Sequence, residues 1–163
     1  MRALRCYSDA VAELEQLAAQ HKDKSIVLIG PQNIGKTTIG RLTAAQLGYA
    51  CIDSDDLMLE YYNKQKRCNI VNIKLLYKKL GWYRFRQLER RIIKSINFSE
   101  INLVVSLGGG AHLYSFGSLF ILRPAIVVLL YNWHKFCLPR LLRVIVGYVV
   151  AYRRIFLLEC ESR

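Results

Sequence analysis

The stretch that decides the fold is Gly30-Pro-Gln-Asn-Ile-Gly-Lys-Thr-Thr-Ile-Gly40, which directly follows the apolar run Ser25-Ile-Val-Leu-Ile29. Its first eight residues satisfy the pattern G-x-x-x-x-G-K-[ST] in full. In this pattern the glycines bring backbone N–H groups onto phosphate oxygens, and the following helix adds the positive end of its dipole. Lys36 reaches the β- and γ-phosphates, and the Thr37 hydroxyl binds Mg²⁺. Because a buried strand precedes this loop and a helical pattern follows it, the stretch predicts a nucleotide-binding P-loop.

Apolar strand patterns alternate with helical patterns along the rest of the chain. The sequence predicts strands at residues 25–29, 49–52, 102–107 and 125–130, and helices at 8–21, 36–47 and 70–98. Ser8 is a candidate cap of the first helix, Gly48 ends the second, Asp53-Ser-Asp-Asp56 opens another, and Gly81 breaks the last. Such alternation is typical of parallel sheets. We therefore expect one α/β domain, a three-layer P-loop fold with a central parallel sheet flanked by helices.

The composition favours an anionic partner. The chain has 163 residues and a formal charge of +12, which suits nucleic acid or small phosphorylated and carboxylated molecules. The cations spread over half the chain instead of forming a stripe interleaved with aromatic residues, so we expect a solvated basic surface and no nucleic-acid partner. The five cysteines lack metal-ligand spacing and indicate reduced thiols in a cytoplasm. We find no signal peptide and no apolar run of roughly 18 residues, so we expect no membrane partner.

Three further segments bear on the phosphate acceptor. Asp53 and Asp55 follow the second strand, where one carboxylate could support a metal ion and the other accept a proton from a substrate hydroxyl; an N-cap cluster explains them equally well. Arg86 lies on a helix crowded with arginines, and its guanidinium could grip a carboxylate bidentately. Residues 108–110 are three consecutive glycines, which permit either a tight turn or a close approach of backbone to a ligand.

These segments occur together in one order: GPQNIGKTTIGRLTAAQLGY at 30–49, IDSDD at 52–56 with Glu60 after it, FRQLE at 85–89, and SLGGGA at 106–111. The series resembles shikimate kinases, in the nucleoside-monophosphate-kinase branch of P-loop proteins. Gluconate and adenylate kinases share the first segment but not the series. The resemblance covers about residues 25–130. It divides the chain into an N-terminal helical extension, 1–24, and a P-loop kinase domain, 25–163, in which 131–163 form a shortened lid and C-terminal region.

The resemblance implies a role for each matching position. It implies transfer of the ATP γ-phosphate to the 3-hydroxyl of shikimate in aromatic amino acid biosynthesis, by a cytoplasmic monomer that uses ATP and Mg²⁺. Lys36, Asp53 and Asp55 would be catalytic, with Thr37 and Asp53 at the metal. ATP would be held by Gly30, Pro31, Gln32, Asn33, Ile34, Gly35, Lys36, Thr37 and Thr38. Shikimate would be held by Asp55, Arg86, Gly108, Gly109 and Gly110.

The chain departs from the family at two places. Asn33 replaces a common glycine, and asparagine tolerates a left-handed φ better than most residues. After residue 130 the expected lid segments are displaced: we assign Arg140 as the lid arginine at the transferring phosphate and Arg153 as a second clamp on the substrate carboxylate, although both could equally be basic residues on an apolar tail. Three alternatives therefore remain: a relative that binds nucleotide without transferring phosphate, a kinase of another hydroxy acid, and a nucleic-acid-binding protein.

Overall fold

The computed structural model describes residues 2–111, 124–130 and 149–151. Helices and strands alternate along most of this length. In chain order they are α1 (Arg2–Gln20), β1 (Ile26–Ile29), α2 (Lys36–Leu47), β2 (Ala50–Asp53), α3 (Ser54–Lys66), α4 (Ile73–Ser95), β3 (Leu103–Ser106), β4 (Ile126–Leu129) and β5 (Val149–Ala151).

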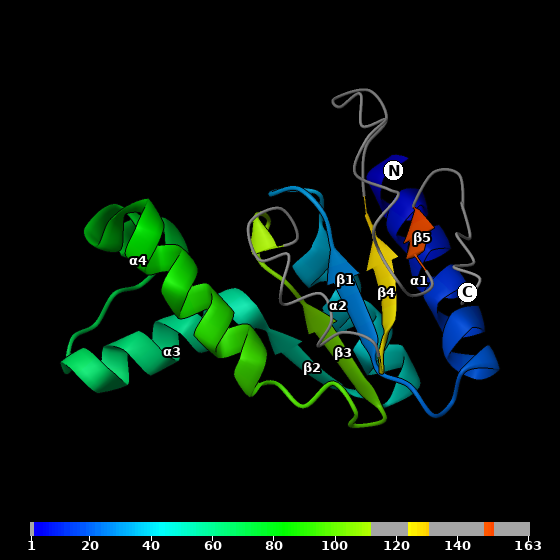
Figure 1. The fold of residues 1–163 in the computed structure, drawn as a ribbon. Helices are drawn as coiled ribbons and strands as arrows, with labels where there is room; N and C mark the ends of the chain where they lie inside the picture. Colours follow the sequence, from blue (N-terminus) through cyan, green and yellow to red (C-terminus); the bar gives the residue numbers. More distant parts are fainter. Residues whose placement is uncertain (1, 112–123, 131–148, 152–163) are drawn as a thin grey trace, which may run out of the picture.

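The strands form one parallel sheet in the order β2-β3-β1-β4-β5. At its centre, Val27 of β1 is in register with Val105 of β3 and Val127 of β4. Figure 1 shows the sheet in the middle of the molecule, with α3 and α4 extending away from its β2 edge. Because all the strands run the same way, their carboxyl ends and the loops that follow them lie along one edge.

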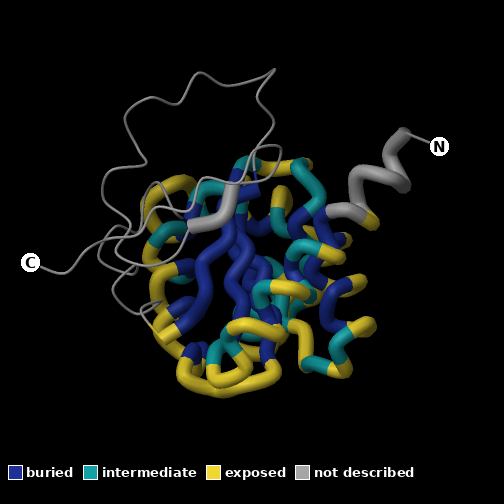
Figure 2. Tube along the Cα trace, turned by 90° about the vertical axis from the view of Figure 1, so that its right-hand side faces the viewer, coloured by how far each residue is buried: buried dark blue, intermediate teal, exposed yellow. Residues whose placement is uncertain are grey.

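Apolar side chains on both faces of the sheet form two core clusters. Ile26 and Leu28 pack with Ile39 and Ala44 of α2 on one face, whereas Val27 and Ile29 join a second cluster on the other. That second cluster contains Ile93 from the end of α4 and Ile96 and Phe98 just after it. Figure 2 shows the buried strands enclosed by partly exposed segments. Burial on both faces explains why these strands are apolar without alternation.

The N-terminal helix packs on the α2 side of this core. Ala10, Leu14 and Ala18 belong to the same cluster as Ile26 and Leu28, so one stripe of α1 is buried against the sheet layer. The helix predicted at residues 8–21 is therefore present. Its predicted start is wrong, because α1 begins at Arg2 and Ser8 lies within it; the helix-forming residues Arg2-Ala-Leu-Arg5 continue the helix past the expected cap.

Most other element predictions are confirmed. The second helix spans residues 36–47 as expected and ends at Gly48, whose φ of 69° is left-handed. The helix after Asp53 is present, and α4 bends at Gly81, where φ is 70° and ψ is 169°. The second strand was placed one residue too early, since β2 is Ala50–Asp53. Strand β5 was not predicted. None of the helices in the described part of the chain is both long and apolar enough to cross a membrane.

Candidate functional site

The loop between β1 and α2 has the backbone shape that its sequence predicts. Gly30 has φ of 140° and Gly35 has φ of 97°, values that L-residues with a Cβ rarely adopt. A Cβ on Gly30 would also collide with the carbonyl oxygen of Leu130, the residue directly after β4. Asn33 has φ of 61°, a left-handed conformation that asparagine tolerates better than most residues. The loop thus turns sharply at the carboxyl edge of the sheet and leads directly into the N-terminus of α2.

Lys36 is buried under this loop and only 8% exposed. Its ammonium donates hydrogen bonds to the carbonyl oxygens of Gly30, at 2.8 Å, and Pro31, at 2.7 Å. Burial lowers the pKa of Lys36 from its ordinary value, and the nearby carboxylates of Asp55 and Asp53 act in the opposite direction. A cation held in this way at the mouth of a loop of backbone N–H groups is suited to phosphate oxygens.

Asp53 connects the loop to the next strand. Thr37 Oγ1 donates to Asp53 Oδ2 at 2.6 Å, and the Asp55 N–H donates to Asp53 Oδ1 at 2.9 Å. Asp53 is therefore the N-cap of α3, as the N-cap interpretation of this carboxylate proposed. It also contacts the P-loop threonine, as its alternative role beside a metal ion requires.

The hydroxyl of Thr37 and the carboxylate of Asp53 are both oxygen ligands of the kind Mg²⁺ prefers. They lie together beside the phosphate loop and so fit a magnesium ion. Within the described ranges no three His, Cys, Asp or Glu side chains gather into a metal site. A magnesium ion at Thr37 and Asp53 would therefore draw most of its ligands from phosphate and water, as is usual for Mg²⁺ at nucleotide sites.

Asp55 carries the strongest electrostatic signal in the site. Its pKa is raised to about 6, first by burial and then by the like charges of Asp53 and Glu89, whereas Lys36 opposes the shift. A carboxyl with a pKa near 6 is ionised at neutral pH yet is a better proton acceptor than an ordinary aspartate. The arrangement can therefore take a proton from a hydroxyl placed against Asp55.

Arg86 and Glu89 form a buried ion pair on the second half of α4. Arg86 Nη1 lies 2.8 Å from Glu89 Oε1 and 2.7 Å from Oε2, and Glu89 is only 1% exposed. Burial raises the pKa of Glu89, and the hydrogen bond and charge of Arg86 oppose the shift. The sequence analysis missed Glu89 as a site residue, although the i, i+3 spacing in FRQLE was a signal that the two side chains could pair.

The three glycines after β3 lie between these groups. A Cβ on Gly108 would stand 2.8 Å from Asp55 Oδ1 and 3.1 Å from Glu89 Oε1. A Cβ on Gly109 would collide with Gln32 of the phosphate loop, and one on Gly110 with the guanidinium of Arg86. The glycines therefore allow the backbone of this turn to contact three separate parts of the site.

These residues surround one hollow of about 400 Å³ at the carboxyl edge of the sheet. Predicted residues from three segments line it: Gln32, Asn33, Gly35, Lys36, Thr37, Thr38, Asp53, Asp55, Gly108 and Gly109. Ile73 and Lys74, from the first turn of α4, also line it and were not predicted. The predicted residues Arg86 and Gly110 do not line it; Arg86 lies against Gly110 and pairs with Glu89, whose Oε1 lies beside Gly108. The predicted residues Arg140 and Arg153 lie outside the described residues.

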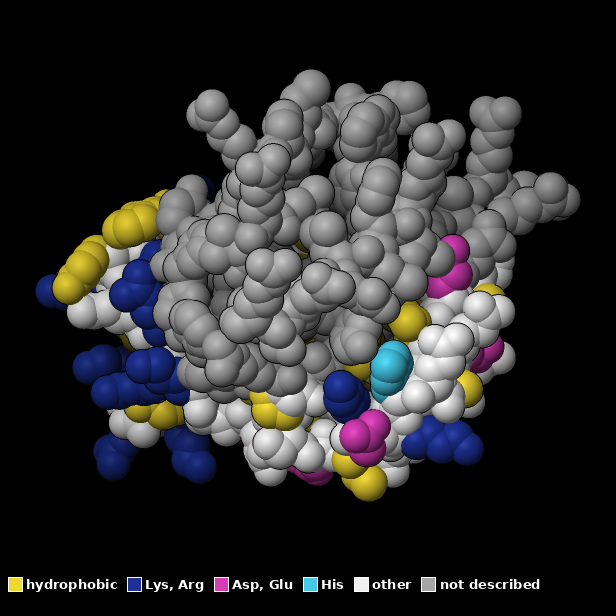
Figure 3. All heavy atoms as spheres, turned by 45° about the vertical axis from the view of Figure 1, so that its right-hand side comes forward, with side chains coloured by type: hydrophobic (Ala, Val, Ile, Leu, Met, Phe, Trp, Pro, Cys, Tyr) yellow, Lys and Arg dark blue, Asp and Glu magenta, His cyan; other side chains and the backbone are white. Residues whose placement is uncertain are grey.

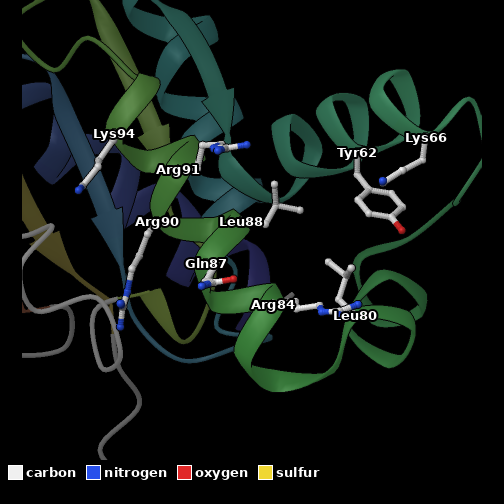
Figure 4. Close-up of a pocket in the computed structure, with 9 residues that line it drawn as sticks. All are labelled: Tyr62, Lys66, Leu80, Arg84, Gln87, Leu88, Arg90, Arg91 and Lys94. Atoms are coloured by element: carbon white, nitrogen blue, oxygen red, sulfur yellow. The ribbon is translucent and has the colours of Figure 1, made fainter.

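A larger hollow, of about 760 Å³, lies between α3 and α4. Figure 4 shows Tyr62 and Lys66 of α3 facing Leu80, Arg84 and Leu88 of α4 across it. The nine residues that line it include no carboxylate, so it holds no counterpart of Asp55. In Figure 3, Lys and Arg side chains gather at the left of the view, on the side of α3 and α4. This hollow is part of the basic surface that the sequence predicted.

Comparison with known proteins agrees with this geometry. A family model described as shikimate kinase matches residues 32–141. Over 104 residues the chain is 36% identical to a pentafunctional AROM polypeptide of Saccharomyces cerevisiae, covering 63% of the chain and 6% of that protein. Over 90 residues it is 40% identical to a shikimate kinase of Francisella tularensis, covering 55% of the chain and 47% of that enzyme. The chain thus spans about half the length of one relative and a small part of the other.

Solved structures support the same grouping. The chain superposes on shikimate kinase from Acinetobacter baumannii in complex with shikimate with a TM-score of 0.56 and 30% identity. The superposition covers 71% of this chain and 60% of that one. The predicted three-layer P-loop fold, with its central parallel sheet and flanking helices, is confirmed.

The buried ion pair makes a prediction about stability. Glu89→Ala leaves the largely buried Arg86 cation without its carboxylate, and breaking one side of a buried pair costs about 3–5 kcal/mol. We expect the free energy of unfolding, measured by urea denaturation, to fall by that amount. Glu60→Ala, which removes an exposed glutamate from α3, serves as the control and should change it by less than about 0.5 kcal/mol. Equal effects of the two substitutions would contradict the pairing.

Proposed function

The chain belongs to the shikimate kinase family, and from that premise we propose that it transfers the γ-phosphate of ATP to the 3-hydroxyl of shikimate. The products are ADP and shikimate 3-phosphate, a step of aromatic amino acid biosynthesis. One observation carries the proposal: the phosphate loop, the Asp55 carboxyl and the glycine turn line a single hollow. A donor phosphate and an acceptor hydroxyl can therefore meet there.

Each group has a role in this reaction. The backbone of residues 30–38 and the Lys36 ammonium bind the ATP phosphates and hold the γ-phosphate at the edge of the sheet. Thr37 and Asp53 hold Mg²⁺, which when bound neutralises charge on the phosphates. Asp55 accepts the proton of the shikimate hydroxyl while the oxygen of that hydroxyl forms a bond to the γ-phosphorus. The bond between this phosphorus and the β–γ bridging oxygen breaks, and ADP is released.

The acceptor is held by a different set of groups. Arg86 pairs with the shikimate carboxylate, and its bond to Glu89 through Nη1 keeps the guanidinium oriented against Gly110. The turn at residues 108–110 lays backbone along the shikimate ring. Positioning and charge stabilisation account for most of the catalysis in phosphoryl transfer of this kind.

The remaining assignments complete the proposal. Arg140 meets the transferring phosphate and Arg153 adds a second contact to the substrate carboxylate. Residues 25–163 form the kinase domain, with a shortened lid and C-terminal region at 131–163, and residues 1–24 are an extension held by the burial of Leu14 and its neighbours on α1. The protein acts as a cytoplasmic monomer on a small-molecule substrate, without nucleic-acid or membrane partners.

The experiment that tests the proposal is coupled ADP release by the purified protein with ATP and Mg²⁺, with and without shikimate. We expect release that depends on shikimate and is abolished in Lys36→Ala, because the substitution removes the phosphate contact. Lys22→Ala, at an exposed lysine before β1, should keep full activity. Nucleotide binding without release would instead support a relative that transfers no phosphate. ADP release with another hydroxy acid, but not with shikimate, would support a kinase of a different substrate. Salt-sensitive binding of RNA or DNA would support a nucleic-acid-binding function.

The shifted pKa of Asp55 predicts the pH dependence of the reaction. Because Asp55 must be ionised to accept a proton and its pKa is raised to about 6, kcat should fall about tenfold per pH unit below that value. An ordinary aspartate would hold the rate down to about pH 4. We expect Asp55→Asn to lower kcat and remove this acidic limb, measured between pH 5 and 8. Asp56→Asn, at the neighbouring exposed aspartate that pairs with Arg41, should retain the limb. An unchanged limb in Asp55→Asn would assign it to another group.

The proposed carboxylate contact predicts a selective effect on shikimate. Arg86→Lys replaces a planar fork with a point charge that cannot make two parallel hydrogen bonds. We expect the KM for shikimate to rise about tenfold or more while the KM for ATP stays within about twofold. Arg84→Lys, on an exposed position of the same helix, is the control. A change in the KM for ATP alone would place Arg86 at the nucleotide.

A further inference from the structure

Ser54 is a buried polar residue to which neither the sequence analysis nor the reaction above gives a role. It lies between Asp53 and Asp55 at the first position of α3 and is 0% exposed. Its hydroxyl oxygen accepts a hydrogen bond of 2.9 Å from the backbone N–H of Gly108. This bond joins the start of α3 to the turn that follows β3.

The turn that Ser54 holds lies against Asp55 and Arg86, the two side chains proposed for the acceptor in the described part of the chain. Gly108 packs against the carboxylates of Asp55 and Glu89, and Gly110 packs against the guanidinium of Arg86. These contacts are too close to leave room for a Cβ. A displacement of the turn would therefore change the surroundings of the proposed proton acceptor and of the proposed carboxylate ligand together.

A turn of three glycines needs such an anchor. Glycine loses more conformational freedom on folding than any other residue, so consecutive glycines do not hold a shape by themselves. On the strand side, the Leu107 N–H donates to the Leu28 carbonyl at 2.9 Å, and on the far side the Ala111 N–H donates to the Gly108 carbonyl at 3.0 Å. Ser54 supplies the bond from the turn to α3. Without its hydroxyl the buried Gly108 N–H would lose this acceptor, which favours movement of the turn toward another.

We propose that Ser54 is a positioning residue for the acceptor substrate: its hydroxyl fixes the turn at residues 108–110 so that Asp55 and Arg86 face shikimate in the reactive arrangement. The effect on shikimate rests on the function proposed above, whereas the anchoring of the turn does not. Ser54 itself touches neither ATP nor the transferred phosphate. Its role therefore differs from those of Asp53 and Asp55, its neighbours on both sides.

The test compares Ser54→Ala with Ser54→Thr, which keeps the hydroxyl, and with Ser25→Ala as a matched control. Ser25 is also a 0% exposed serine with one hydrogen bond, from its Oγ to the Phe98 carbonyl at 2.9 Å. It precedes β1, at the opposite end of that strand from the phosphate loop. Both alanine variants remove one buried serine bond, so they should lose similar stability, but only one of them releases the turn.

Two measurements report on the variants. The first is hydrogen exchange of the Gly108 amide, which we expect to be at least about tenfold faster in Ser54→Ala than in the wild type and unchanged in Ser25→Ala. The second is steady-state kinetics, in which the KM for shikimate should rise about tenfold in Ser54→Ala while the KM for ATP stays within about twofold. Ser54→Thr should restore both values toward the wild type.

The outcomes distinguish this inference from the proposed function. Unchanged exchange of the Gly108 amide in Ser54→Ala overturns the anchoring, whatever the activity. Faster exchange with unchanged shikimate kinetics, or an equal rise of KM in Ser25→Ala, overturns the positioning role. If the wild type neither binds nor phosphorylates shikimate, the proposed function fails, and the proposal that Ser54 positions shikimate fails with it. Hydrogen exchange of the Gly108 amide still decides whether Ser54 anchors the turn.

Discussion

The parallel pairing of β2, β3 and β1 is the constraint on which the rest of the structure depends. Parallel strands place their carboxyl ends along one edge, so residues far apart in the chain become neighbours there. Lys36 after β1, Asp53 at the end of β2 and the glycine turn after β3 meet for this reason. The apolar strands form the core, and through their parallel pairing they also determine which polar groups lie together at the edge of the sheet. Burial of Val27 and its partners stabilises the pairing that brings the site together.

The site concentrates charges that a stable protein would otherwise keep apart. The charges of Asp53 and Glu89 add to the burial that raises the pKa of Asp55, and the Lys36 ammonium opposes this shift. The Arg86 guanidinium opposes the corresponding shift of Glu89. Desolvation contributes most to the shift of Asp55, and the turn at Gly108 lies directly against this carboxylate. A raised pKa in a hollow beside a phosphate loop is the pattern expected of a functional group.

The sequence predicted those features of the structure that depend on neighbouring residues in the chain better than those that depend on residues far apart in the chain. The bounds of α2 and the kink at Gly81 follow from residues next to them in the chain, and both were predicted correctly. The start of α1 was misplaced because a capping serine is a weak local preference that strong helix formers can override. For Glu89 the local spacing indicates the pair with Arg86, but not its burial beside Gly108, which depends on packing. Ser54 was missed because its partner is defined by packing alone. A buried serine is indistinguishable from an exposed one until Gly108 is known to lie against it.

The consecutive residues Asp53, Ser54 and Asp55 point toward three different parts of the site. The geometry at the start of a helix explains why they can do so. Asp53 is extended, with φ of −108° and ψ of 123°, whereas Ser54 and Asp55 are helical, so successive side chains diverge instead of following one face. Asp53 contacts Thr37 of the phosphate loop, Ser54 holds Gly108, and Asp55 faces the hollow. The N-cap bond from the Asp55 N–H to Asp53 fixes the relative directions of the two carboxylates. The strand-to-helix junction therefore directs Asp53 to the phosphate loop and Ser54 to the turn at Gly108, while both carboxylates, Asp53 and Asp55, line the same hollow.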